Sequence, residues 1–172
     1  MEVPELLRNF RVYDEGNDLI GISDVEMPSL EAMSETVKGA GIAGEIDSPV
    51  VGHFSNMELK LNWRTVIKRN IALAAPKSYQ LDLRGDQQVY DSSAGVYKTC
   101  ALKVVVRGVP KTTELGKMDV GTGTGTSNTF AVNYLKVDID GTTVIEIDKY
   151  NYVCKIDGVD YLSESREALG LV

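Results

Sequence analysis

The chain has 172 residues, of which 43% are hydrophobic and 25% charged, and its formal net charge at pH 7 is −7. This composition is typical of one globular domain and excludes collagen, coiled-coil and largely disordered chains. No segment approaches the roughly 18 consecutive apolar residues of a membrane helix, and acidic residues stand where a signal peptide would carry basic ones. We therefore expect no membrane insertion and no export by a standard signal.

Strand patterns begin at the N-terminus. Residues 10–14 and 18–22 flank the turn sequence Glu15-Gly16-Asn17, which predicts an opening hairpin. Residues 25–37 have the character of extended chain, but Pro28 cannot donate a ladder hydrogen bond. This proline therefore marks an edge, a start or a bulge.

Residues 38–51 lack a regular pattern and are rich in glycine. We expect a long loop here, centred on residues 39–52. Loops of this length are uncommon inside compact domains and are usually functional or mobile.

The next segment combines a strand with a helix. Alternation over residues 54–63 predicts a strand with one buried and one solvated face. A helical period then runs from Trp63 to Ala74, with basic residues on its other side, and Pro76 ends it.

The second half predicts further antiparallel strands over 78–84, 88–90, 96–109, 111–118, 129–138 and 142–148. Two Asp-Gly pairs, Asp140-Gly141 and Asp157-Gly158, predict tight turns. The chain ends with a pattern for a short helix closed by Gly170. Together these elements predict a mainly β domain of the β-sandwich or barrel-like type, with one flanking α-helix and a short C-terminal helix.

The two cysteines, Cys100 and Cys154, have only His53 as a possible partner for metal binding, which is too few ligands for a zinc site. Each cysteine falls within an alternating apolar pattern, so we expect two reduced, buried thiols. A disulfide between them is the alternative that the count allows.

Motifs for catalysis or phosphate binding are weak. The loop Gly121-Thr-Gly-Thr-Gly-Thr-Ser lacks the lysine of a phosphate-binding loop and lies between two strands, which favours a hairpin loop. His53 has no accompanying G-x-S-x-G sequence and is expected to be a structural or exposed residue. We assign no catalytic, cofactor-binding or metal-binding residue.

Charge is distributed unevenly along the chain. Residues 1–58 carry a net charge of −9, residues 59–117 carry +7 and residues 118–172 carry −5. The charges of the three blocks either mix on the folded surface or form complementary faces, as a head-to-tail interface between identical copies requires.

Several segments resemble the major tail tube proteins of contractile-tailed bacteriophages, to which the tubes of R-type bacteriocins are closely related. The resemblance rests on Val104-Val-Val-Arg-Gly-Val-Pro-Lys, on Asn133-Tyr-Leu-Lys-Val-Asp-Ile-Asp-Gly and on Ile156-Asp-Gly-Val-Asp-Tyr-Leu, in that order. In the N-terminal half it rests on Met27-Pro-Ser-Leu-Glu, a glycine-bearing segment and Met57-Glu-Leu-Lys-Leu-Asn-Trp. The Gly/Thr-rich segment 121–126 departs from the charged loop of relatives.

The resemblance implies a single tail tube domain over residues 1–172 and a structural function without enzymatic activity or cofactor. It implies hexameric rings that stack head to tail into the hollow inner tube of a contractile tail, a conduit for DNA. The implied partners are the tail sheath protein, the baseplate hub, the tail terminator, the tape measure protein and, transiently, DNA. The implied location is a virion tail or bacteriocin-like particle assembled in the host cytoplasm.

The resemblance also suggests which residues make contacts. Inter-ring candidates lie in the loop 39–52 and are Gly39, Gly41, Ile42, Gly44, Glu45, Asp47 and Pro49. Candidates for a charged contact with the next ring or with the sheath are Lys60, Arg64, Lys68 and Arg69. We expect acidic or neutral residues along a lumen that must not bind DNA. The alternative function is a small β-sandwich binding module, or accessory domain, with a ligand at the 39–52 loop.

Overall fold

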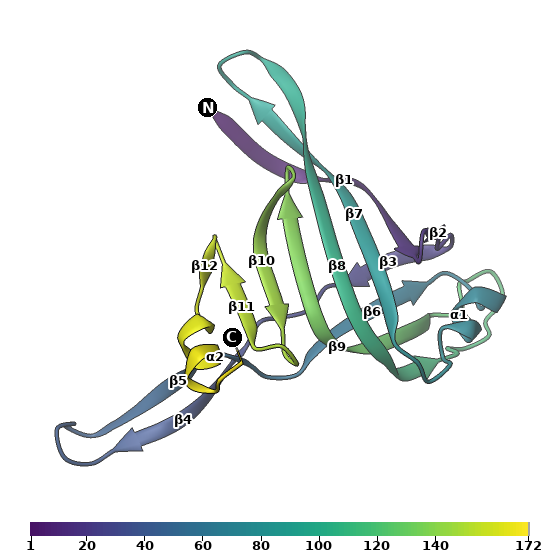
Figure 1. Ribbon diagram of the computed structural model, residues 1–172. Helices are drawn as coiled ribbons and strands as arrows, with labels where there is room; N and C mark the ends of the chain where they lie inside the picture. The colour runs from purple at the N-terminus through teal and green to yellow at the C-terminus, as the bar shows by residue number, and fades with distance from the viewer. Residues whose placement is uncertain (172) are drawn as a thin grey trace.

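Twelve strands and two short helices make up the computed structural model, which describes residues 1–171 (Figure 1). The strands are β1 (Glu2–Asp14), β2 (Asn17–Asp18), β3 (Ile22–Glu26), β4 (Ala32–Lys38), β5 (Glu45–Phe54), β6 (Met57–Trp63), β7 (Tyr79–Asp91), β8 (Val96–Glu114), β9 (Thr126–Ile139), β10 (Thr142–Asp148), β11 (Val153–Ile156) and β12 (Val159–Asp160). The helices are α1 (Lys68–Ala72) and α2 (Ser163–Ala168). The expected mainly β class with two short helices is confirmed.

Ten strands form one antiparallel sheet that branches at β9. Residues 126–132 of β9 pair with β6, whereas residues 134–139 pair with β10. One branch continues through β10 and β11 to β12, and the other continues through β6 to β3. On its other side β9 pairs with β8, which leads through β7 to β1. The six strands β3-β6-β9-β8-β7-β1 form a curled, barrel-like sheet.

The core lies inside this curled sheet. Strand β6 alternates as the sequence predicts, with Met57, Leu59, Leu61 and Trp63 buried. The facing side chains come from β7, β8 and β9 and include Leu81, Leu83, Val104, Val106 and Phe130. A period of two along each strand therefore separates an apolar inner face from a polar outer face.

Helix α1 is shorter than the sequence pattern predicts. Trp63, expected as its first apolar residue, belongs to β6, and the chain is still extended at Ile67. Asn70 fixes the helix instead: its side-chain oxygen accepts the Ile67 N–H at 2.9 Å, and its backbone oxygen accepts the Asn128 amide at 3.1 Å. Because strand and helix periods overlap at Trp63, the sequence pattern placed the boundary too early.

Two pairs of expected strands are continuous in the structure. Residues 79–91 form the single strand β7, and residues 96–114 form β8 through Pro110. The pairing of β8 with β9 shifts register between Pro110 and Thr112. A bulge of this kind accommodates the missing N–H of proline without ending the strand.

The two cysteines differ in their surroundings. Both are free thiols, but only Cys154 is buried, with 1% exposure, whereas Cys100 is half-buried. The prediction of a buried thiol is thus confirmed for Cys154 and wrong for Cys100. Cys100 lies where β8 extends beyond the core, so alternation persists there but no second layer covers it. Burial raises the pKa of the Cys154 thiol above its ordinary value.

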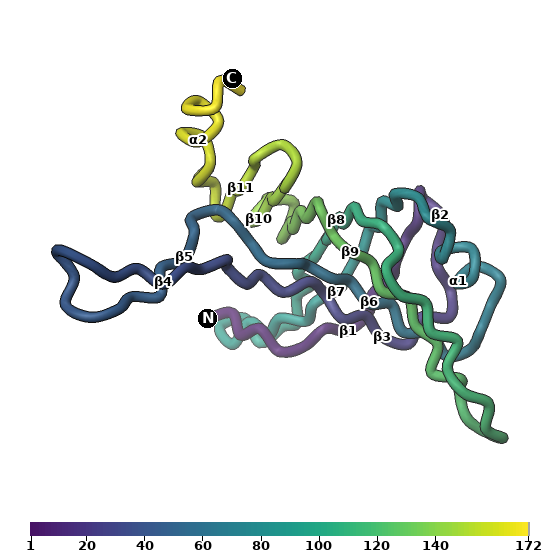
Figure 2. The backbone as a smooth tube through the Cα atoms, turned by 90° about the horizontal axis from the view of Figure 1, so that it is seen from below, coloured from purple at the N-terminus to yellow at the C-terminus, as the bar shows by residue number. Residues whose placement is uncertain are grey.

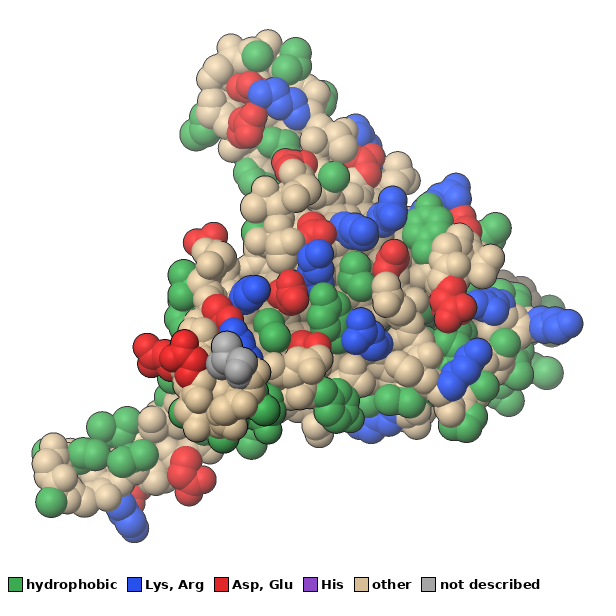
Figure 3. Space-filling model, viewed as in Figure 1, with side chains coloured by type: hydrophobic (Ala, Val, Ile, Leu, Met, Phe, Trp, Pro, Cys, Tyr) green, Lys and Arg blue, Asp and Glu red, His purple; other side chains and the backbone are tan. Residues whose placement is uncertain are grey.

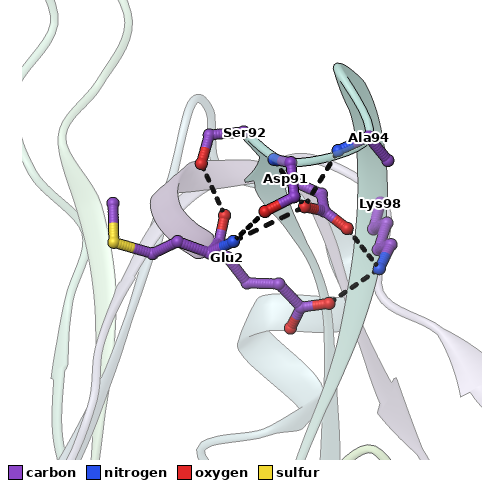
Figure 4. A network of polar contacts seen from close by, with 7 residues as sticks. Glu2, Asp91, Ser92, Ala94 and Lys98 are labelled. Atoms are coloured by element: carbon purple, nitrogen blue, oxygen red, sulfur yellow. Dashed lines mark hydrogen bonds and ion pairs between the residues drawn. The ribbon is translucent and has the colours of Figure 1, made fainter.

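The N-terminal half of β1 is held to the turn between β7 and β8 by a polar network (Figure 4). Lys98 contacts the carboxylates of Glu2 and Asp91 at 2.8 and 2.9 Å. Asp91 also accepts the backbone N–H groups of Ser93 and Ala94, and the Ser92 N–H donates to the oxygen of the first residue. These contacts lower the pKa of Asp91. The outermost turn of the sheet is therefore ordered although no apolar core lies beneath it.

Candidate assembly surfaces

Strands β4 and β5 form a separate two-stranded hairpin that projects from the rest of the molecule (Figures 1 and 2). We call residues 32–54 the arm. All of β4 and most of β5 are exposed. An isolated hairpin is marginally stable in water, so this hairpin is suited to contact another surface.

One face of the arm carries apolar side chains, with Glu35 and Ser48 as a polar pair on the same face. Val37 and Ile46 are cross-strand partners and are 39% and 50% exposed. Met33, Val50 and Val51 are also exposed along the arm, and apolar atoms are visible along it in Figure 3. The other face carries Lys38 opposite Glu45, with a 3.9 Å ion pair. Exposed apolar side chains grouped on a projection are typical of an interaction surface.

The base of the arm is fixed to the body. The Ser55 N–H donates to the Glu31 oxygen at 2.8 Å, and Lys149 donates to the Ser55 oxygen at 2.9 Å. Gly52 has a φ of +75°, and a Cβ atom there would lie 2.5 Å from Leu162. Leu162, just before α2, thus packs directly on the arm's backbone. This contact sets the direction in which the arm leaves the body.

The inter-ring candidates all lie on the arm, but the expected long loop over 39–52 is wrong. Only residues 39–44 form the loop at the tip, where Gly39, Gly41, Ile42 and Gly44 lie; Glu45, Asp47 and Pro49 lie on β5. Glycines and Pro49 hide the strand pattern, and Pro49 still has Ser34 as its register partner. Because the hairpin has no second layer, no apolar alternation indicated it.

A second surface is an apolar cleft where the barrel-like sheet fails to close. The strands at its two ends, β1 and β3, face each other across the cleft, which has a volume of about 180 Å³. Its lining side chains come from β1, β3, the segment after β3, β7 and β8, and they include Leu7, Phe10, Val25, Met27, Leu83 and Leu102. Met27 and Leu102 also line a neighbouring hollow of about 160 Å³ over β9 and β10. Core side chains are therefore accessible from outside.

A third surface is the polar face of the sheet β7-β8-β9-β10-β11. On this face the side chains alternate with buried ones such as Leu83 and Val104. Its charged side chains are six acids and six bases, namely Asp82, Asp86, Glu114, Asp138, Glu146, Asp148, Arg84, Lys103, Arg107, Lys111, Lys136 and Lys155. Arg107 stacks over Tyr134 at 4.7 Å from the ring centre. The face is broad, polar and balanced in charge.

The four basic candidates do not form one free patch. Arg64 and Lys68 are exposed, whereas Lys60 is half-buried and lies 4.0 Å from Glu26. Arg69 pairs with the carboxylate of Asp14, which is 2% exposed. Burial raises the pKa of Asp14, although Arg69 opposes this shift. Arg69 therefore makes a contact within the fold. Of the four basic candidates, only Arg64 and Lys68 are exposed and unpaired in the described chain, and so remain available to bind a partner.

The structure shows where His53 and the Gly/Thr-rich segment, to which the sequence assigned no function, lie. His53 is exposed, and its Nδ1 lies 3.0 Å from the Val51 oxygen. The Gly/Thr-rich segment is the connection between β8 and β9, where Gly116 allows the backbone to approach Thr124 closely. Met118 and Val120, 98% and 99% exposed, project from this loop.

Within residues 1–171 no cluster of three or more His, Cys, Asp or Glu side chains could hold a metal ion, and no helix could cross a membrane.

A curled antiparallel sheet, a projecting arm with exposed apolar side chains and an open apolar cleft are features of a protein that contacts other chains. The chain belongs to the family described as phage tail tube protein FII, whose model matches residues 4–170. Tail tube proteins are virion components. The resemblance recognised in the sequence is confirmed.

Individual relatives agree with the family. The chain is 28% identical over 178 residues to the tail tube protein of Escherichia phage P2, covering 99% of this chain and all of that one. It is 26% identical to the major tail tube protein of Serratia phage KSP20, covering 99% of both. Among solved structures, it is similar in fold to a chain from the sheath/tube terminator of an extracellular contractile injection system, with a TM-score of 0.52 and 11% identity. That match covers 78% of this chain and 96% of the other.

Sequence reasoning did not identify the cleft. Leu7, Phe10 and Met27 lie far from Leu102 in the chain, and their patterns are those of ordinary core residues. Only the topology, which leaves β1 and β3 unpaired with each other, shows that this part of the core is open. Pro28, beside Met27, was the one local signal that regular pairing ends there.

Proposed function

We propose that this chain assembles into hexameric rings that stack head to tail, forming the hollow inner tube of a contractile phage tail or tail-like particle. Membership of the tail tube family supports the proposal, and the observation that carries it is the arm. The arm presents an apolar face for which its own body offers no cover. A repeating assembly of identical copies supplies that cover at every position.

In this proposal the arm is the main contact between successive rings. Its tip carries Gly39, Gly41 and Gly44, where a Cβ atom would meet open space, so the tip is able to fit a neighbouring surface. Its polar side carries Glu45 and Asp47 for hydrogen bonds or ion pairs. Contacts of modest strength suffice because each ring contributes six of them in parallel.

The polar face of the sheet β7 to β11 is the proposed lining of the conduit. Neighbouring subunits would place their sheets side by side around the lumen, and contacts with other copies would cover the exposed sheet edges. A lining with equal numbers of acids and bases lacks the basic groove that holds a nucleic acid backbone. DNA would therefore pass without stable binding.

The sheath, the baseplate hub, the tail terminator and the tape measure protein are the proposed partners, besides further copies of this chain. The outer wall of the tube would meet the sheath, and Arg64 and Lys68 are candidates for that contact. Assembly would take place in the host cytoplasm. No specific observation favours the alternative of a ligand-binding module, because residues 45–52 of the expected ligand loop belong to strand β5.

Sedimentation velocity together with negative-stain electron microscopy tests the proposal. Purified protein is measured over a wide concentration range, with and without a baseplate hub complex to initiate growth. We expect rings with sixfold symmetry and tubes built from them. Species no larger than a dimer under every condition would contradict the proposal.

A further inference from the structure

We infer that the cleft between β1 and β3 is the receptor for the arm of a second copy of this chain. The inference rests on the proposed self-assembly and names the surface that receives the arm. It starts from two features of one molecule: an arm with exposed apolar side chains, and an open apolar cleft at the edge of the curled sheet.

The first argument is that the two strands beside the cleft, β1 and β3, have free backbone hydrogen-bonding groups. In the described chain, β3 pairs only with β6, and residues 2–11 of β1 pair only with β7. Each strand therefore offers a row of unpaired backbone N–H and C=O groups beside the cleft. Such edges are natural sites for adding strands from another chain.

The second argument is strand direction. The path β1-β7-β8-β9-β6-β3 contains five antiparallel pairings, so β1 and β3 run in opposite senses. A single inserted strand would be antiparallel to one border and parallel to the other. A hairpin offers strands of both senses, so one of its strands can lie antiparallel to whichever border it meets. The arm is such a hairpin.

The third argument is chemical fit. The cleft exposes Leu7, Phe10 and Met27 above the buried side chains of Leu83 and Val104. The arm's apolar face, with Val37 and Ile46, would cover them. Apolar contact of this kind stabilises association by about 25 cal/mol for each Å² removed from water, before the entropic cost of binding.

The molecule's own arm is held away from its own cleft. The hydrogen bonds Ser55 to Glu31 and Lys149 to Ser55, and the packing of Leu162 on Gly52, fix the arm's base. Figure 1 shows the arm pointing away from β1 and β3. Met27, at the start of the segment that leads to the arm, itself lines the cleft. The occupant is therefore a second copy, and the contact is head to tail.

Photo-cross-linking in mixed assemblies tests this inference. A benzophenone amino acid replaces Val37 in unlabelled chain, which is assembled with an excess of 15N-labelled chain and irradiated. We expect cross-links from the arm to ¹⁵N-labelled peptides containing β1, β3, residues 83–85 or residues 102–104. The same probe at Tyr97, exposed at the far end of β8, is the control and should not label these peptides.

A cleft variant gives an independent measurement. Phe10→Glu in the ¹⁵N-labelled chain places a charge among apolar side chains, and we expect the yield of arm-to-cleft cross-links to fall at least about tenfold. Tyr97→Glu is the matched change at an exposed site and should leave the yield unchanged. Circular dichroism of both variants verifies that they fold.

The outcomes separate this inference from the proposed function. Assembly with arm cross-links to any other surface, or only within one chain, overturns the inference and leaves the tube proposal intact. Assembly with an unchanged cross-link yield for a folded Phe10→Glu variant also overturns it. Failure of the unmodified chain to assemble overturns the tube proposal and this inference together.

Discussion

Asp14 is the buried carboxylate that ties β1 to α1. Its only charged hydrogen-bond partner in the described chain is Arg69, and one of its oxygens is buried without a hydrogen bond. A carboxyl group with a raised pKa destabilises the fold above that pKa and ceases to do so as it becomes protonated.

We predict that Asp14→Asn changes the pH dependence of stability in a defined direction. Because burial raises the pKa of Asp14 in the folded state, the wild type gains stability relative to Asp14→Asn as the pH falls from 7 to 4. Urea unfolding of both proteins at pH 7, 5 and 4 measures the difference. A difference that is independent of pH, or that changes in the opposite direction, would contradict the assignment.

Gly52 provides a second prediction at this scale. Gly52→Ala places a methyl group 2.5 Å from Leu162 in a backbone conformation with φ of +75°. Gly95→Ala is the control, because Gly95 has φ of +68° and open space around it. We expect about 1–2 kcal/mol of destabilisation for the control and about 1–3 kcal/mol more for Gly52→Ala from overpacking. Equal unfolding free energies of the two variants would contradict the packing of Leu162 on the arm.

Among elements, the arm contributes little to the stability of its own subunit. Replacing residues 34–49 by Asn-Gly joins β4 to β5 through a short turn and removes the exposed part of the arm. We expect the variant to keep the thermal midpoint of the wild-type monomer within a few degrees, since no core side chain is lost. Tube formation should be abolished in the electron microscope. Tubes of normal length would show that the arm is dispensable.

Helix α2 depends on Asp160. The carboxylate of Asp160 accepts the Leu162 N–H at 3.1 Å and pairs with Arg166, which lowers its pKa. A depressed pKa stabilises the fold above the ordinary value of about 3.9, and this stabilisation is lost as the pH falls through the lower, folded value.

We predict that Asp160→Asn is less stable than the wild type at pH 7 and that the difference narrows below about pH 4. This direction is opposite to the one expected for Asp14→Asn. Chemical unfolding at pH 7 and pH 3 measures both differences with the same method. A constant difference between wild type and Asp160→Asn would show that the Arg166 pair does not contribute.

How far the sequence predicts the elements depends on their contact with the core. The alternation in β6 and the Asp140-Gly141 turn were read correctly, because the core and backbone sterics determine them locally. Residues 25–37 were read as extended chain, which agrees with β4, but β5 was read as part of a loop because its glycines and Pro49 interrupt the strand pattern and most of its residues are exposed. The cleft was missed because it is a property of strand pairing between distant segments.

For the whole molecule, the basic middle third of the sequence does not become a single face. Most of its charges lie on the polar sheet face or in ion pairs within the chain, as with Lys98 and Lys111. Of the other bases, Lys77 and Lys117 are exposed, and Arg64 and Lys68 are exposed near α1. Individual exposed ion pairs contribute about 0–1 kcal/mol. They therefore add appreciably to the free energy of association only when they are repeated in an assembly.

We predict that Arg64→Glu together with Lys68→Glu affects either tube growth or sheath attachment while the monomer stays folded. Tube length in the electron microscope and co-sedimentation with sheath protein are measured separately and identify which contact uses this face. Lys77→Glu together with Lys117→Glu makes the same change in net charge and is the control. If neither property of the double variant changes, Arg64 and Lys68 take no part in assembly.

The long register of β7, β8 and β9 has a mechanical consequence. These strands pair over most of their length, with backbone hydrogen bonds perpendicular to the strand direction. A force along the strands loads these bonds in shear, so many must break at once, whereas a force across the sheet opens them one after another. The subunit is therefore stiffest along the strand axis and most compliant across the gap between β1 and β3.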